Sequence, residues 1–158
     1  MELGDCIGLQ DVIEKIANGV SIVTSKSGDK INGLAIAWMS QVSITPPQVM
    51  VAIGKAKYTH ELIDKSKVFA INILSENQKA LAKHFGLQSG RKVDKFSNVE
   101  HESKKTGAPI LKDCLAYLDC RLSKSLDVGD HTILVGEVVD AGVKRKEAPL
   151  IYNSKDYF

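Results

Sequence analysis

Residues 31–47 read INGLAIAWMSQVSITPP, and this stretch decides the fold that we expect. As an extended strand it alternates small and bulky side chains. The small face carries Gly33, Ala35 and Ala37, whereas the bulky face carries Leu34, Ile36 and Trp38. A strand face without bulk is typical of a place that a flat ligand or another backbone approaches closely. The equally weighted alternative is a tight barrel interior in which the alanines make room for neighbouring side chains.

The end of this stretch is polar and then stops. Met39, Ser40, Gln41 and Ser43 offer small or polar groups that can contact the edge of a ligand. The following proline pair, residues 46–47, ends the strand because proline cannot donate to a sheet ladder.

Working outward, the pattern predicts short strands joined by brief helices. We expect strands over 20–24, 48–53, 68–74, 116–122, 132–139 and 149–152, and helices over 11–17 and 58–66. A further helix is expected to be capped within residues 75–78 and to stop at Gly86. Gly19 is the expected left-handed end of the first helix. Turns are expected at 26–30 and 127–130, and the polar segment 88–107 is expected to be a surface excursion that covers a site. This spacing favours a mostly antiparallel barrel over a doubly wound parallel sheet.

Composition favours one soluble, cytoplasmic domain over residues 1–158. Of 158 residues, 44% are hydrophobic, which is enough for a core, yet no apolar run reaches bilayer length. The start of the chain lacks the basic-then-apolar order of a secretory signal. A net charge of +2 from scattered lysines gives no reason to expect nucleic acid or a membrane surface.

The three cysteines have no CxxC spacing, so neither a disulfide framework nor a metal site is predicted. Cys114 and Cys120 would share a face if their strand were regular, and packed reduced thiols are the simplest interpretation. The four histidines show no spacing typical of metal ligands. Without GxGxxG, a Walker loop, a catalytic triad or a carboxylate pair, any enzymatic chemistry is expected to come from a cofactor.

Residues 54–61, GKAKYTHE, form a candidate anion site. Lys55 and Lys57 precede a helix whose cap and first turn hold Tyr58 and Thr59. Free backbone N–H groups, the helix dipole, a hydroxyl and two ammonium groups together suit a phosphate. A simple helix N-terminus with solvated lysines is the alternative, and it is the commoner arrangement.

His131 lies in DVGDHTILVGE, at the mouth of a predicted strand. A histidine at a strand end is more often a satisfied surface group than a catalytic one. His84 and Phe85 stand before Gly86 at a helix end, where capping and core packing explain them.

Taken in order, these segments resemble the flavin reductase-like family of FMN-binding split barrels. The matching segments span nearly the whole chain: NGVSIVTS, NGLAIAWMSQVSITPPQVMVAI, KYTHELI, KVFAINIL, LAKHFG, GAPIL, AYLDCRL, GDHTILVGEV and PLIY. The chain is most similar to small prokaryotic members, which include flavoredoxin-like proteins, ferric reductases and flavin domains fused to rubredoxin. One difference is that residues 37–41 read AWMSQ where many members read Asn-Ser-Phe-Thr-Ser, so fewer hydroxyls face the ring.

The resemblance implies a Greek-key split β-barrel with short peripheral helices, and a homodimer that binds FMN rather than FAD near the subunit interface. It implies that residues 35–41 line the isoalloxazine, that Lys57, Tyr58 and Thr59 hold the phosphate, and that Ser43 assists. His84 and Phe85 would lie close to the flavin, and His131 near the nicotinamide. Residues 91–96 would cover the pocket.

The implied activity is transfer of a hydride from NADH or NADPH to flavin, with electrons passing on to free flavin, iron or a redox protein such as a rubredoxin. Two alternatives stay open. The chain can be an electron-transfer module whose FMN is reduced by a protein partner, or a non-catalytic barrel that stores or senses flavin.

Overall fold

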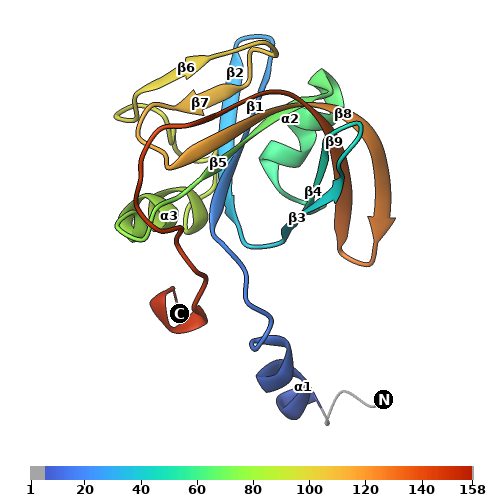
Figure 1. Ribbon diagram of the computed structural model, residues 1–158, viewed down its shortest axis with the longest axis vertical. Coiled ribbons are helices and arrows are strands. Elements are labelled where there is room, and N and C mark those ends of the chain that lie inside the picture. The colour runs from blue at the N-terminus through green and yellow to red at the C-terminus, as the bar shows by residue number, and fades with distance from the viewer. Residues whose placement is uncertain (1–5, 158) are drawn as a thin grey trace.

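The computed structural model describes residues 6–157 and confirms a mostly β protein (Figure 1). A seven-stranded antiparallel sheet runs in the order β2-β1-β5-β8-β9-β4-β3. Its strands are β1 (Ser21–Ser27), β2 (Lys30–Ile36), β3 (Met39–Ser43), β4 (Gln48–Gly54), β5 (Val68–Ile73), β8 (Ala116–Val128) and β9 (His131–Val143). A separate antiparallel pair is formed by β6 (His101–Ser103) and β7 (Pro109–Leu111).

The helices are short, and the N-terminal one lies apart from the sheet (Figure 1). They are α1 (Cys6–Ile13), α2 (Tyr58–Ser66), α3 (Lys79–Gly86) and a 3-10 turn, η2 (Ser154–Asp156). α2 has the bounds that the sequence predicts. It ends at Lys67, whose backbone takes the left-handed conformation with φ 61°.

Two buried clusters lie on opposite sides of the central strands β1 and β5. On β1, Ile22 packs into a cluster with Phe85 of α3, whereas Val23 packs into the barrel interior with Phe69 and Ile71 of β5. Successive side chains of a strand point to opposite faces, so a strand buried on both sides must be nearly continuously apolar. This requirement explains the runs VSIVT and VFAINIL.

Residues 31–47, the stretch that decides the expected fold, contribute to two strands rather than one. β2 stops at Ile36 and β3 starts at Met39, at opposite edges of the sheet, so residues 37–38 bridge the seam of the open barrel. Leu34, Ile36 and Met39 pack toward the barrel interior, as the alternation predicts for the first two. Trp38 belongs to neither buried cluster and is 50% exposed, so its predicted place on the bulky face is wrong.

The small face of β2 is covered by α3. A Cβ added at Gly33 would lie 3.2 Å from Cδ1 of Phe85, and one added at Gly86 would lie 3.2 Å from Cβ of Ala35. The small face therefore does not line the barrel interior, and at these two positions glycine and alanine instead let α3 approach the strand from outside the barrel.

Several predicted boundaries need correction. The first helix spans 6–13 rather than 11–17, and Gly19 has no positive φ, so it does not end that helix. β8 and β9 extend as a long hairpin whose turn is confined to residues 129–130. Residues 149–152 contribute isolated bridges instead of a strand, and β7 was not expected.

Cys114 lies before β8 and packs in the cluster around α3, whereas Cys120 points into the barrel. The two thiols therefore do not share a strand face. Both are free and buried, and burial raises the pKa of Cys114 to about 11 and that of Cys120 to about 12.

Candidate functional site

The N-terminus of α2 offers groups that can hold an anion. Lys57 is its N-cap and makes no side-chain capping bond, so the first backbone N–H groups keep their capacity to bind a ligand. The Thr59 hydroxyl is buried and accepts a hydrogen bond from Nδ2 of Asn32 at 3.0 Å. Because the hydroxyl accepts in this bond, its own proton is available for a further acceptor.

Lys95 is a buried cation that the sequence reasoning did not single out. Its side chain is 4% exposed, and Nζ donates to the carbonyl oxygens of Phe85 at 2.8 Å and Gly33 at 2.9 Å. Within residues 6–157, no carboxylate oxygen lies within 4.0 Å of this ammonium group. Burial, helped by the nearby charge of Lys57, lowers the pKa of Lys95 to about 8. Two cations without an acidic partner favour an anionic ligand.

Lys95 lies in a polar run of the sequence, and this polarity does not indicate that the residue is buried. The only available signal was Phe96 beside it, an isolated aromatic residue in a charged segment. Phe96 is buried against Phe85, with ring centroids 5.3 Å apart, and this contact draws the neighbouring lysine inward.

Residues 90–96 lie along β2 and the start of α2. The Arg91 guanidinium stands 4.9 Å from the ring centroid of Tyr58 and pairs with Glu61 at 3.0 Å. Hydrogen bonds from Lys65 and then Arg91 lower the pKa of Glu61. An open pocket of about 640 Å³ lies between this segment and β2, and Lys30, Asn32, Tyr58, Arg91 and Lys95 are among its lining residues.

His84 and Phe85 have structural partners in this fold. Nε2 of His84 lies 2.7 Å from the carbonyl oxygen of Lys95, and its Nδ1 lies 3.1 Å from Nε2 of Gln88. Phe85 is fully buried in the cluster around α3. Packing and loop anchoring therefore account for both side chains, and their contact with a flavin stays a prediction.

His131, at the first position of β9, stands beside two other side chains. Its Nδ1 lies 2.6 Å from Oδ1 of Asp130, and this hydrogen bond lowers the pKa of the carboxyl. Its ring lies 4.7 Å from that of Trp38 at an interplanar angle of 46°. Because Nδ1 is engaged by the carboxylate, Nε2 is the ring atom free for a ligand.

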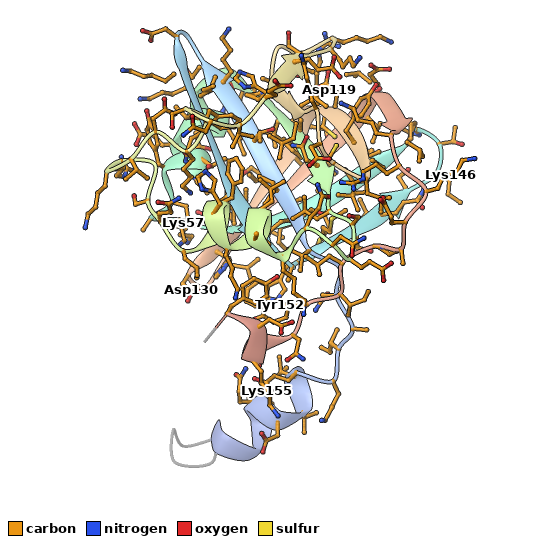
Figure 2. The ribbon with its side chains drawn as sticks, turned by 90° about the vertical axis from the view of Figure 1, so that its left-hand side faces the viewer. Lys57, Asp119, Asp130, Lys146, Tyr152 and Lys155 are labelled. Carbon is orange, nitrogen blue, oxygen red and sulfur yellow. The ribbon has the colours of Figure 1, made fainter. Side chains whose placement is uncertain are left out.

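Lys57 of the predicted phosphate site and His131, predicted to lie near the nicotinamide, meet at Gly54. A Cβ at this glycine would lie 3.5 Å from Cγ of Lys57 and 3.9 Å from Nε2 of His131. Figure 2 shows Lys57 and Asp130 on the same side of the molecule, and the backbone N–H of Lys55 donates to the carbonyl oxygen of Asp130 at 3.1 Å. The β4–β9 pairing, which aligns Gly54 with His131, produces this meeting.

The remaining predicted residues are spread along the seam. Ser40 and Gln41 are exposed on β3 and bond only to nearby carbonyl groups, while Ser43 is half-buried. Ile36 is a core residue, and Ala35 and Ala37 are half-buried. Thus Trp38 is the member of the 35–41 group whose side chain contacts His131.

Two kinds of feature are absent from the described part of the chain. No helix among these residues is long and apolar enough to cross a membrane. Residues 6–157 also hold no group of three or more histidine, cysteine or acidic side chains placed to bind a metal ion.

Comparison with known proteins points to flavin chemistry. The family model for the flavin reductase like domain matches residues 13–158 of this chain. The high molecular weight rubredoxin of Moorella thermoacetica is 36% identical over 89% of this chain, and the match covers 62% of that protein. Diflavin flavoprotein A 1 of Synechocystis is 33% identical over 88% of this chain and 24% of its own length. This chain thus spans less than two thirds of both relatives.

Among solved structures, the NADH:FAD oxidoreductase of Streptomyces globisporus C-1027 superposes with a TM-score of 0.86 at 28% identity, covering 96% of this chain and 91% of that one. The same oxidoreductase has also been solved in complex with NAD and FAD fragments. The chain therefore belongs to the flavin reductase like domain family of flavin-linked oxidoreductases.

Proposed function

We propose that this chain is an NAD(P)H-dependent flavin oxidoreductase that uses FMN and passes electrons to free flavin, iron or a redox protein. The observation that carries the proposal is the meeting of Lys57 and His131 at Gly54. A cation suited to a phosphate and an imidazole suited to a nicotinamide stand at one end of the barrel. One flavin nucleotide beside one nicotinamide would use both.

The residues present fit a flavin phosphate. Lys57 and Lys95 supply positive charge, the first turn of α2 supplies backbone N–H groups, and Thr59 supplies a hydroxyl proton. An N-terminal helix turn alone is a weak anion site, but Lys95, which is buried without a carboxylate partner among residues 6–157, adds an independent preference for negative charge nearby. Tyr58 and Arg91 form the outer wall of this phosphate site.

Bound FMN would supply the redox chemistry, accepting a hydride and delivering electrons to the acceptor. The chain's own contribution is orientation. With Nδ1 held by Asp130, His131 would direct Nε2 to the nicotinamide amide or carry a proton there. The backbone of residues 37–41, crossing the seam, would lie beside the isoalloxazine and exclude water from one side.

The test is an anaerobic absorbance titration of FMN-loaded protein with NADH and then NADPH. Prompt bleaching of the flavin band near 450 nm is the expected result. His131→Ala should slow this bleaching about tenfold or more while leaving FMN affinity within about twofold, because one positioned proton carrier is worth at least this factor. Equal loss of both properties would contradict the role given to His131.

A second candidate is an electron-transfer module that keeps FMN and is reduced by a protein. The 36% identity to a high molecular weight rubredoxin favours this candidate. FMN-loaded protein that neither NADH nor NADPH bleaches, but that a reduced rubredoxin does, would replace the first proposal with this one.

We also propose that residues 1–158 form one domain that pairs with a second copy. Edge strand β3 has an open side, Val42 and Ile44 beside it are 51% and 82% exposed, and Leu126 on the β8–β9 hairpin is 61% exposed. An unpaired edge with apolar side chains favours association. Ile44→Asp should convert a dimer to a monomer in light scattering, and a wild-type monomer would refute the proposal.

A further inference from the structure

Trp38 is a large apolar side chain that the described fold does not bury. Half of its surface is exposed, although its backbone is fixed where its carbonyl oxygen accepts a hydrogen bond from Ala52 N–H at 3.0 Å. The indole therefore stands on a well-held backbone with one side available. Exposing such a ring is unfavourable unless a ligand or partner covers it.

The only aromatic ring that contacts Trp38 within residues 6–157 is that of His131. Together the two rings form a continuous aromatic surface at the mouth of the barrel. Asp130 engages Nδ1 of the imidazole and Trp38 contacts its ring, while Nε2 lies 3.9 Å from the position that a Cβ of Gly54 would occupy. The indole is thus placed both to fix His131 and to meet any flat ring that approaches Nε2.

From this geometry we propose that Trp38 is a binding residue for the electron donor, with its exposed indole face packing on the nicotinamide ring. The inference rests on the proposed function, because it requires a nicotinamide beside His131. An indole is electron-rich, and the oxidised nicotinamide is a cation, whereas the reduced ring is neutral. Trp38 should therefore hold the oxidised product more strongly than the reduced donor.

The kinetic test uses FMN-loaded Trp38→Ala, Trp38→Phe and a control, Val143→Ala. Val143 is 79% exposed at the opposite end of β9 from His131. In Trp38→Ala we expect the KM for the reduced nucleotide to rise about threefold, and the inhibition constant of the oxidised nucleotide to rise about tenfold, as suits one aromatic or cation–π contact. Trp38→Phe should keep both the KM and the inhibition constant close to their wild-type values, and Val143→Ala should change neither constant.

A spectroscopic test is available because Trp38 is the only tryptophan in the chain. Its indole N–H gives a single cross-peak in a proton–nitrogen spectrum of the FMN-loaded protein. Oxidised nicotinamide mononucleotide, which lacks adenosine, should shift this peak saturably. A peak that stays in place at concentrations that inhibit flavin reduction would overturn the inference.

The outcomes separate the two proposals. Wild-type protein that NADH or NADPH reduces, together with Trp38→Ala that keeps both constants within twofold, would refute the role of Trp38 and leave the proposed function intact. Wild-type protein that neither nucleotide reduces would refute both. Dithionite, which needs no docking site, should reduce all variants equally, and unequal reduction would assign Trp38 a structural role instead.

Discussion

Replacing Lys95 by methionine should change how the stability of this protein depends on pH. Methionine keeps much of the side-chain length but carries no charge. Nζ of Lys95 is buried, and its pKa is lowered to about 8 from an ordinary value of 10.5. Between pH 8 and pH 10.5, this lysine therefore keeps its proton in the unfolded chain but has lost it in the folded chain. The free energy of unfolding consequently rises with pH across this window.

The magnitude follows from the two pKa values. At pH 7 the charged lysine costs the folded state about 3 kcal/mol relative to high pH, and at pH 10 it costs about 1 kcal/mol. The difference in unfolding free energy between wild type and Lys95→Met should thus shift by about 2–3 kcal/mol in favour of wild type between pH 7 and pH 10. The hydrogen bonds lost to Gly33 and Phe85 add a constant offset that does not alter this shift.

The assay is urea denaturation of both proteins without flavin at pH 7, 8, 9 and 10. Lys124→Met is the matched control, because Lys124 is exposed on the β8–β9 hairpin. Its difference from wild type should stay constant within about 0.5 kcal/mol, as for surface substitutions in general. A flat difference curve for Lys95→Met would refute the reasoning, because it would mean that Lys95 is solvated or paired in solution.

Three further predictions concern other parts of the molecule. Lys57→Met should weaken FMN binding about fivefold, roughly 1 kcal/mol for an exposed charge, and leave riboflavin binding unchanged in a fluorescence titration. Gly136→Ala should destabilise the fold by about 1–3 kcal/mol in urea denaturation, because its Cβ would lie 2.5 Å from Cζ of Phe69 in the barrel interior. With the N-terminal cysteine replaced by serine, a thiol reagent at pH 8 should modify Cys114 and Cys120 only on unfolding, because burial raises the pKa of both thiols; fast modification of native protein would contradict this.

The places of several candidate residues in helices and strands could be predicted, because these residues lie beside helix and turn signals in the sequence. Lys57, Tyr58 and Thr59 stand at a helix start that the sequence marks, and His131 follows a turn that opens a strand. Burial of Lys95 could not be predicted from its polar neighbours, because it depends on Phe96 packing against Phe85 of a different element.

The sequence by itself determined the β-rich class, the α2 bounds and the two-faced pattern of the strands, because periodicity and turn preferences act among residues close together in the chain. Only the tertiary structure decided that α3 covers Gly33 and Ala35, and that Trp38 crosses the seam to meet His131. Those contacts depend on sheet order and on β9 pairing with β4, which juxtapose residues far apart in sequence. Preferences that act between neighbouring residues cannot specify these contacts, because the contacts form only when distant segments are buried against one another.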